Sequence, residues 1–230
     1  MRRQIQQMED AGFDFVILNL PADHPMVMET VNVFFQQLHS HNLRAAVQVD
    51  ALYDATPEVK RQWAADVINR WGSQPEYLRL NGQPVVYLYA ASIDFNLPNV
   101  EVHNVYWTRD YTQGRNTYNP FGVLPPEDWP FWAASPVPVI NGVAPIIPGY
   151  SDTHLNRSFS MEHPREGSRL YREQWEQAVG QHPEYIVVYS WNEYFEETAI
   201  EPTTAWGDEF VRITRCFSDK IRNHTNANCS

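Results

Sequence analysis

The chain has 230 residues, of which 43% are apolar, enough for one sizeable hydrophobic core in a single layered domain over residues 1–230. Seventeen basic against 28 acidic residues give a net charge of −11, which argues against binding to nucleic acid or to an anionic membrane surface. No apolar run reaches the ~20 residues of a membrane span, and residues 1–8 (MRRQIQQM) lack the apolar stretch of a signal peptide.

Helical and extended patterns alternate from the N-terminus onward. Residues 4–12 predict the end of a helix, and residues 13–19 (FDFVILN) predict a strand that is buried on both faces. Apolar residues between positions 27 and 38 recur at the spacing of one helical face. Residues 45–49 (AAVQV) predict the next strand, which ends at Asp50.

The middle of the chain continues this alternation. Thr56 and Pro57 predict the cap and first residue of a helix whose core-facing side chains recur every fourth position from Val59 to Trp71. Asn81-Gly82 predicts a turn before a strand at residues 84–89 (PVVYLY).

The second half of the chain has weaker extended segments and then a strong one. Short strands are predicted at residues 104–107, 131–133 and 143–147, and a clear strand at residues 185–190 (YIVVYS). Apolar residues at helical spacing predict two more helices, one from Tyr171 to Val179 and one from Phe210 to Ile221.

This order of elements predicts an α/β fold built on a parallel sheet, either doubly wound or closed into a (β/α)8 TIM barrel. Seven strands are visible, one fewer than the barrel has, and the chain opens on a helix. Either the first strand lies upstream of Met1, or the barrel is open or closed differently. We prefer the first alternative.

Polar and aromatic side chains gather where these strands end, and in parallel α/β folds the ligand site lies at the carboxyl ends of the strands. The positions are Asn19, Asp50, Tyr89, Trp107, Arg109, Asp110, Trp132, Tyr150, Asp152, Trp191, Asn192 and Glu193. Strand ends also border solvent and are polar for that reason alone. Asp50 would bind a sugar hydroxyl or pair with an arginine, and Trp107 would stack on a sugar or pack in the core.

The segment at residues 190–202 (SWNEYFEETAIEP) is the most informative of these strand ends. Carboxylates beside aromatic rings are poorly solvated, which favours the protonated form that a general acid needs. Glu193 and Glu196 are three residues apart, so in a turn they can point the same way, as the carboxylate pair of a glycosidase does. The alternative is an acidic helix N-terminus.

Three motifs in this region resemble those of glycoside hydrolase family 99. Residues 191–202 (WNEYFEETAIEP) are similar to its Asn-Glu-Trp-x-Glu-Gly-x-x-Ile-Glu-Pro signature, and residues 148–153 (PGYSDT) to its Pro-Gly-Tyr-x-Asp-Thr motif. Residues 167–171 (GSRLY), with Trp175, resemble a Gly-x-x-Tyr helix start of the family. The motifs occur in the family's order and spacing.

The resemblance implies a (β/α)8 barrel that hydrolyses internal α-linked mannosides with retention of configuration and without a metal or cofactor. By motif position, Glu193 would be the base at the sugar 2-hydroxyl, and Glu196 the acid/base at the glycosidic oxygen. Tyr150 matches an active-site tyrosine of the family. Substrate-binding candidates are Tyr150, Asn192, Asp50, Trp107, Tyr89 and Trp191.

Two departures from the signature leave other functions open. Phe195 stands where the mannosidases often have histidine, and Glu197 replaces a glycine. Related signatures occur in α-1,3-glucanases and in proteins of polysaccharide synthesis. The alternatives are therefore an α-1,3-glucanase-like hydrolase, a non-catalytic carbohydrate-binding domain, or an accessory domain of polysaccharide synthesis. A glutamate of the pair held in a salt bridge away from a cleft would favour the binding domain.

The remaining signals concern histidines, cysteines and location. His39 and His41 are two residues apart and do not share a helical face, so we expect no metal site. Cys216 either pairs with Cys229 or stays free and buried. Glycosylation sequons begin at Asn156, Asn223 and Asn228 and favour a secretory setting. We expect a monomer that acts on oligosaccharide or polysaccharide.

Overall fold

The computed structural model describes residues 1–21, 24–50, 55–89, 95–105, 117–118, 137, 139, 142–157, 160, 162–224 and 228–229. The chain divides into two compact units. Unit 1 takes in residues 1–9, 13–106 and 110–117, and unit 2 takes in residues 10–12, 107–109 and 118–230.

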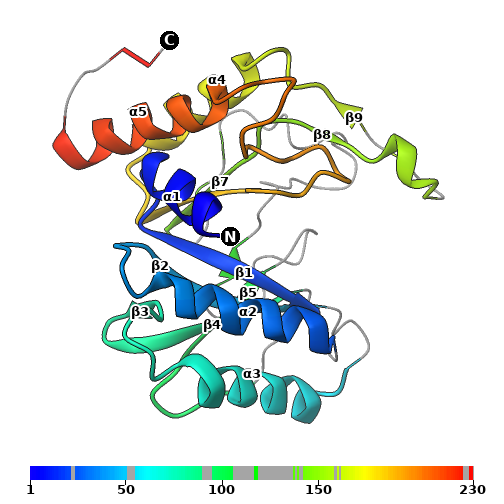
Figure 1. The fold of residues 1–230 in the computed structure, drawn as a ribbon, viewed down its shortest axis with the longest axis vertical. Coiled ribbons are helices and arrows are strands. Elements are labelled where there is room, and N and C mark those ends of the chain that lie inside the picture. The colour runs from blue at the N-terminus through cyan, green and yellow to red at the C-terminus, as the bar shows by residue number, and fades with distance from the viewer. Residues whose placement is uncertain are drawn as a thin grey trace. The chain divides into compact units, whose positions relative to one another are not determined.

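Unit 1 is built on a parallel sheet (Figure 1). Its strands are β1 (Phe15–Pro21), β2 (Arg44–Asp50), β4 (Gln83–Tyr89) and β5 (Glu101–Val105), and each pairs in parallel with the next. The short β6 (Thr117–Tyr118) follows β5 in the order. The predicted strands at 13–19, 45–49 and 84–89 are thus confirmed with small shifts of their ends.

A hairpin lies beside this sheet where the turn was predicted. The strand β3 (Arg79–Leu80) runs antiparallel to β4, and Asn81 and Gly82 join the two with φ angles of 51° and 81°. Positive φ at both central residues is the geometry that Asn-Gly favours in a two-residue hairpin loop.

The helices of unit 1 are α1 (Arg2–Asp10), α2 (Pro25–Leu38) and α3 (Pro57–Trp71). The helix α2 packs on β1 and α3 packs on β4 (Figure 1). The hydroxyl of Thr56 accepts from the N–H of Val59 and caps α3. Val59, expected in the core, is 44% exposed because the buried stripe of α3 runs through Ala64, Val67 and Trp71 instead.

The core of unit 1 contains an aromatic cluster between helix and sheet. Phe35 stacks on Trp71 and on Tyr77, with ring centroids 6.3 Å and 5.6 Å apart. The buried polar atoms of these rings are paired, since Trp71 Nε1 donates to Asn32 and the Tyr77 hydroxyl donates to the carbonyl of Val85.

Unit 2 is built on the parallel pair β7 (Val143–Ile146) and β10 (Tyr185–Val188). After β7, the short strands β8 (Tyr150–Ser151) and β9 (Glu162–His163) pair antiparallel, with a 3-10 helix (Thr153–Leu155) between them. The helices are α4 (Arg169–Gly180) and α5 (Glu209–Asn223).

Aromatic side chains hold α4 and α5 together. Trp175 stacks on Phe217 at 5.4 Å, and Tyr171 meets the edge of Phe210 at the same distance. The Tyr171 hydroxyl lies 2.8 Å from the hydroxyl of Thr214, so this buried polar atom is satisfied. Ile221, at the end of the predicted stripe, is 40% exposed.

A disulfide between Cys216 and Cys229 ties the C-terminal segment to α5. The sequence had left open a free, buried Cys216, and the structure excludes that alternative. Cys229 is buried, and its carbonyl accepts a hydrogen bond from Arg172 of α4. Thus three points of the chain, on α4, on α5 and in the C-terminal segment, are joined.

The fold confirms a mixed α/β architecture with parallel strands, while the described residues show an open sheet and two separate strand pairs, β7 with β10 and β8 with β9, and not a closed barrel. The predicted strand at 131–133 and Trp107, Arg109, Asp110 and Trp132 lie outside the described residues. The single (β/α)8 domain implied by the motifs stays a prediction. Among the described segments, each helix is too short or too polar to serve as a membrane span.

Candidate active site

The loop that follows β10 is closed by its own hydrogen bonds. The N–H of Ser190 donates to the carbonyl of Thr198, the N–H of Thr198 donates to the carbonyl of Glu193, and the N–H of Ile200 donates back to Ser190, all at 3.1 Å. The fully buried Thr198 also places its hydroxyl 3.0 Å from that of Ser190. The two glutamates therefore sit on a defined backbone, not in a frayed helix end.

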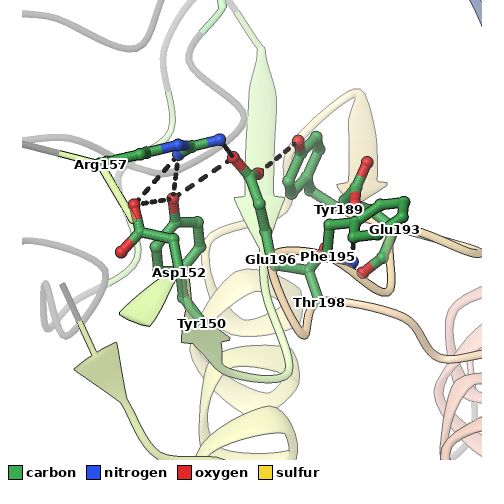
Figure 2. A network of polar contacts seen from close by, with 8 residues as sticks. All are labelled: Tyr150, Asp152, Arg157, Tyr189, Glu193, Phe195, Glu196 and Thr198. Carbon is green, nitrogen blue, oxygen red and sulfur yellow. Dashed lines mark hydrogen bonds and ion pairs between the residues drawn. The ribbon is translucent and has the colours of Figure 1, made fainter. Parts of the chain in front are cut away.

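Glu196 lies at the centre of a polar network in unit 2 (Figure 2). Its Oε1 accepts a hydrogen bond from Arg157 Nη2 at 2.7 Å and lies 3.4 Å from the Tyr150 hydroxyl. Its Oε2 accepts from the Tyr189 hydroxyl at 3.2 Å. The side chain of Glu196 is 15% exposed, so Arg157 and Tyr189, with the Tyr150 hydroxyl nearby, hold a carboxylate that still reaches solvent.

Arg157 links Glu196 to a second, buried carboxylate. Its Nη1 donates to Asp152 Oδ2 and to the Tyr150 hydroxyl, at 3.0 Å in each case. The Asp152 side chain is 2% exposed, and its Oδ2 also accepts from the Tyr150 hydroxyl at 3.1 Å. A buried charge of this kind needs a partner, and the guanidinium of Arg157 supplies it.

The two donors on the Oε1 side keep their protons across the neutral range. Burial raises the pKa of Tyr150 well above its ordinary value, and the negative charges of Glu196 and Asp152 add to this rise. The hydrogen bond to Glu196 raises the pKa of Arg157 as well. Tyr150 is therefore a neutral donor and Arg157 a fixed cation.

Glu193 makes local contacts within the same loop. Its Oε1 accepts from the N–H of Phe195 at 2.9 Å, and its own N–H donates to the hydroxyl of Ser190. The side chain is half-buried. These bonds orient Glu193 from its own loop, whereas Glu196 is oriented by residues from two other segments. That both glutamates act on one substrate stays a prediction.

Arg165, which follows β9, binds the part of the loop that comes after Glu196. Its Nη2 donates to the carbonyls of Glu197 and Ala199, at 2.6 Å each, and its guanidinium lies over the ring of Phe210 at 4.8 Å. Burial lowers the pKa of Arg165 to about 10, so it remains charged at neutral pH. The loop is thus fixed just after Glu196.

Gly149 permits this arrangement because its backbone passes very close to Arg165. A Cβ at Gly149 would lie 2.5 Å from Arg165 Cγ and 3.0 Å from its backbone nitrogen. We expect Gly149→Ala to destabilise the protein by about 1–3 kcal/mol, because a well-packed site must shift to accept the methyl group. Urea unfolding will measure this loss. Gly180→Ala is the matched control, since a Cβ there meets nothing within 4 Å, and an equal effect of both variants would contradict the clash.

The other predicted residues of unit 2 differ in exposure. Tyr150 is buried with its hydroxyl in the network, Asn192 is exposed, and Trp191 is half-buried with its carbonyl accepting from the N–H groups of Ile200 and Glu201. Tyr150 is therefore the predicted binding residue that the structure places directly beside Glu196.

The predicted residues of unit 1 lie at the carboxyl edge of its sheet. Asp50 ends β2 and accepts a hydrogen bond from Asn19 of β1 at 3.1 Å, and Asn19 in turn accepts from Gln48 at 2.9 Å. Tyr89 ends β4. This bond with Asn19 tests neither of the two alternatives for Asp50, an arginine pair or a sugar hydroxyl, and sugar binding by Asp50 and Tyr89 stays a prediction.

Sequence reasoning missed Arg157 and Tyr189 as site residues. The strand predicted at residues 185–190 ends at Val188 in the structure, so Tyr189 follows it, and the strand-end rule applied to this end could have found Tyr189. Arg157 lies in a loop and had no such signal, because only the fold brings it to a glutamate 39 positions away.

The two histidines that we did not expect to bind a metal, His39 and His41, each have a carboxylate partner. His41 lies 2.6 Å from Glu9, and His39 lies 2.8 Å from Glu76. In the portion of the chain that the structure describes, no three histidine, cysteine or acidic side chains are grouped as a metal ion would require.

The fold and the site together define an α/β protein in which the last parallel strand is followed by a loop of acidic and aromatic residues. Two solved structures with this fold are those of the GH99 endo-α-mannosidase from Bacteroides thetaiotaomicron. The one in complex with bis-tris-propane has a TM-score of 0.75 at 17% identity, covering 97% of this chain and 83% of that one. The other has a TM-score of 0.73 at 17% identity, covering 98% of this chain and 80% of that one.

These similarities confirm, at the level of the fold, the resemblance to family 99 that the three motifs indicate. No protein-family model and no curated protein matches the sequence. At 17% identity, the two structures show a shared fold, and the activity of this chain is a separate question.

Proposed function

We propose that this protein is a glycoside hydrolase that cleaves internal α-mannosidic linkages with retention of configuration. The observation that carries the proposal is the carboxylate of Glu196, which is partly exposed and oriented on both oxygens by Arg157, Tyr150 and Tyr189. General acid catalysis requires a carboxyl group held in a fixed position, and the end of a parallel strand is where sites in this class of fold lie. The fold shared with two endo-α-mannosidase structures supports the same reaction class.

The roles within this proposal follow from the motif positions. Glu193 takes the proton of the sugar 2-hydroxyl, whose oxygen then displaces the leaving group internally. Glu196 gives a proton to the departing glycosidic oxygen, and in the second step it removes a proton from the attacking water. As the water adds to the anomeric carbon, the bond from this carbon to the 2-oxygen breaks, and the 2-oxygen takes its proton back from Glu193. Tyr150 keeps its proton because burial raises its pKa, so it acts as a hydrogen-bond donor and not as a base.

A second candidate function has a specific observation in its favour. Glu196 forms an ion pair with Arg157, and such pairing is also what a catalytically silent carbohydrate-binding domain would retain. However, Arg157 has the buried Asp152 as a second anionic partner, so its charge stays balanced when Glu196 carries a proton. The ion pair is therefore compatible with an acid role, and we place hydrolysis first.

Release of reducing sugar from α-mannans and α-glucans separates these candidates. Hydrolysis of α-mannan with oligosaccharide products supports the endo-mannosidase, whereas hydrolysis of α-1,3-glucan alone would instead support the glucanase-like alternative. Binding to these polysaccharides without any release would favour the carbohydrate-binding domain.

Phe195 offers a second test of the proposed site. Its side chain is 70% exposed although it lies between the two glutamates in the sequence, and an exposed ring of this kind suits the apolar face of a sugar. We expect Phe195→Ala to raise KM by about fivefold, corresponding to about 1 kcal/mol of lost ring contact, with a smaller change in kcat.

The control for this variant is Phe195→Tyr, which keeps the ring and should retain the KM of the unmodified protein. An unchanged KM in Phe195→Ala would show that the ring does not contact the substrate.

A further inference from the structure

The two oxygens of the Glu196 carboxyl group face chemically different partners (Figure 2). Oε1 faces Arg157, which has only donors, and the Tyr150 hydroxyl. Oε2 faces the hydroxyl of Tyr189, which can donate one hydrogen bond and accept others. The two oxygens of Glu196 are therefore not equivalent sites for a proton.

A proton on Oε1 is disfavoured by this arrangement. In a neutral carboxylic acid, the carbonyl oxygen is the better acceptor and the protonated oxygen is the donor. The 2.7 Å bond from Arg157 needs an acceptor on the Oε1 side, whereas Tyr150 has a second acceptor for its one proton in Asp152 Oδ2. Arg157 keeps its protons, so Oε1 cannot become the protonated oxygen without losing this charge-assisted bond.

The charges around Glu196 also permit it to be neutral. Arg157 and Asp152 form an ion pair of their own, with Nη1 and Oδ2 3.0 Å apart. With Glu196 protonated, Tyr150, Asp152, Arg157 and Tyr189 sum to zero charge, and with Glu196 ionised the sum for the network is −1. Neither state leaves the guanidinium without an anionic partner.

The backbone of Tyr189 is fixed by the pairing of β10 with β7. Tyr189 is the first residue after β10, and its N–H donates to the carbonyl of Ile146 at 3.0 Å, which extends the pairing of β10 with β7. The half-buried side chain of Tyr189 extends from the residue that follows β10, and the side chain of Glu196 extends from the loop toward the Tyr189 hydroxyl.

We propose that the transferable proton of Glu196 resides on Oε2, and that Tyr189 is the positioning residue that holds it there. The hydroxyl of Tyr189 accepts from Oε2–H in the acid form and donates to Oε2 in the ionised form. During cleavage, the Oε2 proton passes to the glycosidic oxygen as its bond to the anomeric carbon breaks, and Tyr189 keeps its own proton. This inference rests on the proposed function and names a residue that the motifs did not.

The first test compares two leaving groups in the variant Tyr189→Phe. The probes are aryl α-mannobiosides with a phenyl group, which needs protonation to depart, or a 2,4-dinitrophenyl group, which does not. We expect kcat/KM to fall by about 10- to 100-fold for the phenyl glycoside and by less than about threefold for the dinitrophenyl glycoside, since acid assistance serves only the former.

A merely structural role of Tyr189 would lower both rates equally, and that result would overturn the inference. Tyr194→Phe is the matched control, because its hydroxyl donates to Glu201 at 2.7 Å, outside the network, and we expect no dependence on the leaving group. If the unmodified protein cleaves neither glycoside, the proposed function fails. If it cleaves both and Tyr189→Phe shows no preference, only the present inference fails.

A second measurement does not depend on activity or on the folding of Tyr189→Phe. Infrared difference spectra between low and neutral pH contain a carbonyl band for each protonated carboxyl group, and the band missing in Glu196→Gln belongs to Glu196. We expect it at the low wavenumber of a carbonyl that accepts a strong hydrogen bond, because Oε1 accepts from Arg157. A band at the position of an unbonded carbonyl would overturn the assignment of the proton to Oε2.

Discussion

Glu196→Gln is expected to lower kcat/KM on the preferred polysaccharide by about 10³-fold or more, while oligosaccharide binding stays within about threefold. Glutamine has nearly the shape of glutamate, and its amide oxygen can still accept from Arg157, so the site keeps its form. It cannot transfer a proton to the glycosidic oxygen. Initial rates of reducing-sugar release and calorimetric titration with oligosaccharide measure the two effects separately.

The control for this prediction is Glu173→Gln on α4. Glu173 also forms an ion pair with an arginine, Arg169, at 2.7 Å, but on an exposed surface. Losing such a pair costs little, so activity should stay normal. Near-normal activity in Glu196→Gln would rule out its acid role and favour the carbohydrate-binding domain.

Loss of the disulfide between Cys216 and Cys229 should have the largest effect on stability. The bond closes a segment with a sequence separation of 13 residues. In the chain-entropy model, a loop of this length contributes about 3 kcal/mol by restricting the unfolded chain. We expect Cys216→Ser to lower the free energy of unfolding by about this amount in urea titrations.

Two comparisons test the origin of this effect. A reducing agent should destabilise the unmodified protein to the level of Cys216→Ser and should leave the variant unchanged. Ser160→Ala, in another part of unit 2 where the side chain is exposed, is expected to be neutral. An unfolding midpoint that does not respond to reductant would contradict a stabilising disulfide.

Local sequence patterns predicted most of the regular elements. The strands at β1, β2, β4, β7 and β10 and the five helices were recognisable from apolar periodicity. Such elements bury a continuous side or a regular stripe, and that regularity is visible in a short window of sequence. The two-residue strands β3, β6, β8 and β9 depend on pairing partners and have no period to detect.

The candidate site was predicted only in part. Glu193, Glu196 and Tyr150 belong to sequence motifs, and each motif is a short contiguous segment. Arg157 and Tyr189 act through their positions relative to Glu196, and a sequence window cannot show which of many arginines or tyrosines will meet a given carboxylate. Likewise, Cys216 had two plausible states until the structure placed Cys229 beside it.

The sequence by itself determined the alternation of strands and helices, the acidic loop after the last strong strand and the resemblance to family 99, because these are properties of neighbouring residues. Only the tertiary structure decided that Glu196 has unlike partners on its two oxygens, that Arg157 joins it to a buried aspartate, and that Arg165 and Gly149 fix its loop. Hydrogen bonds and ion pairs act over about 3 Å, whatever the separation along the chain, so they exist only once folding has brought distant residues together.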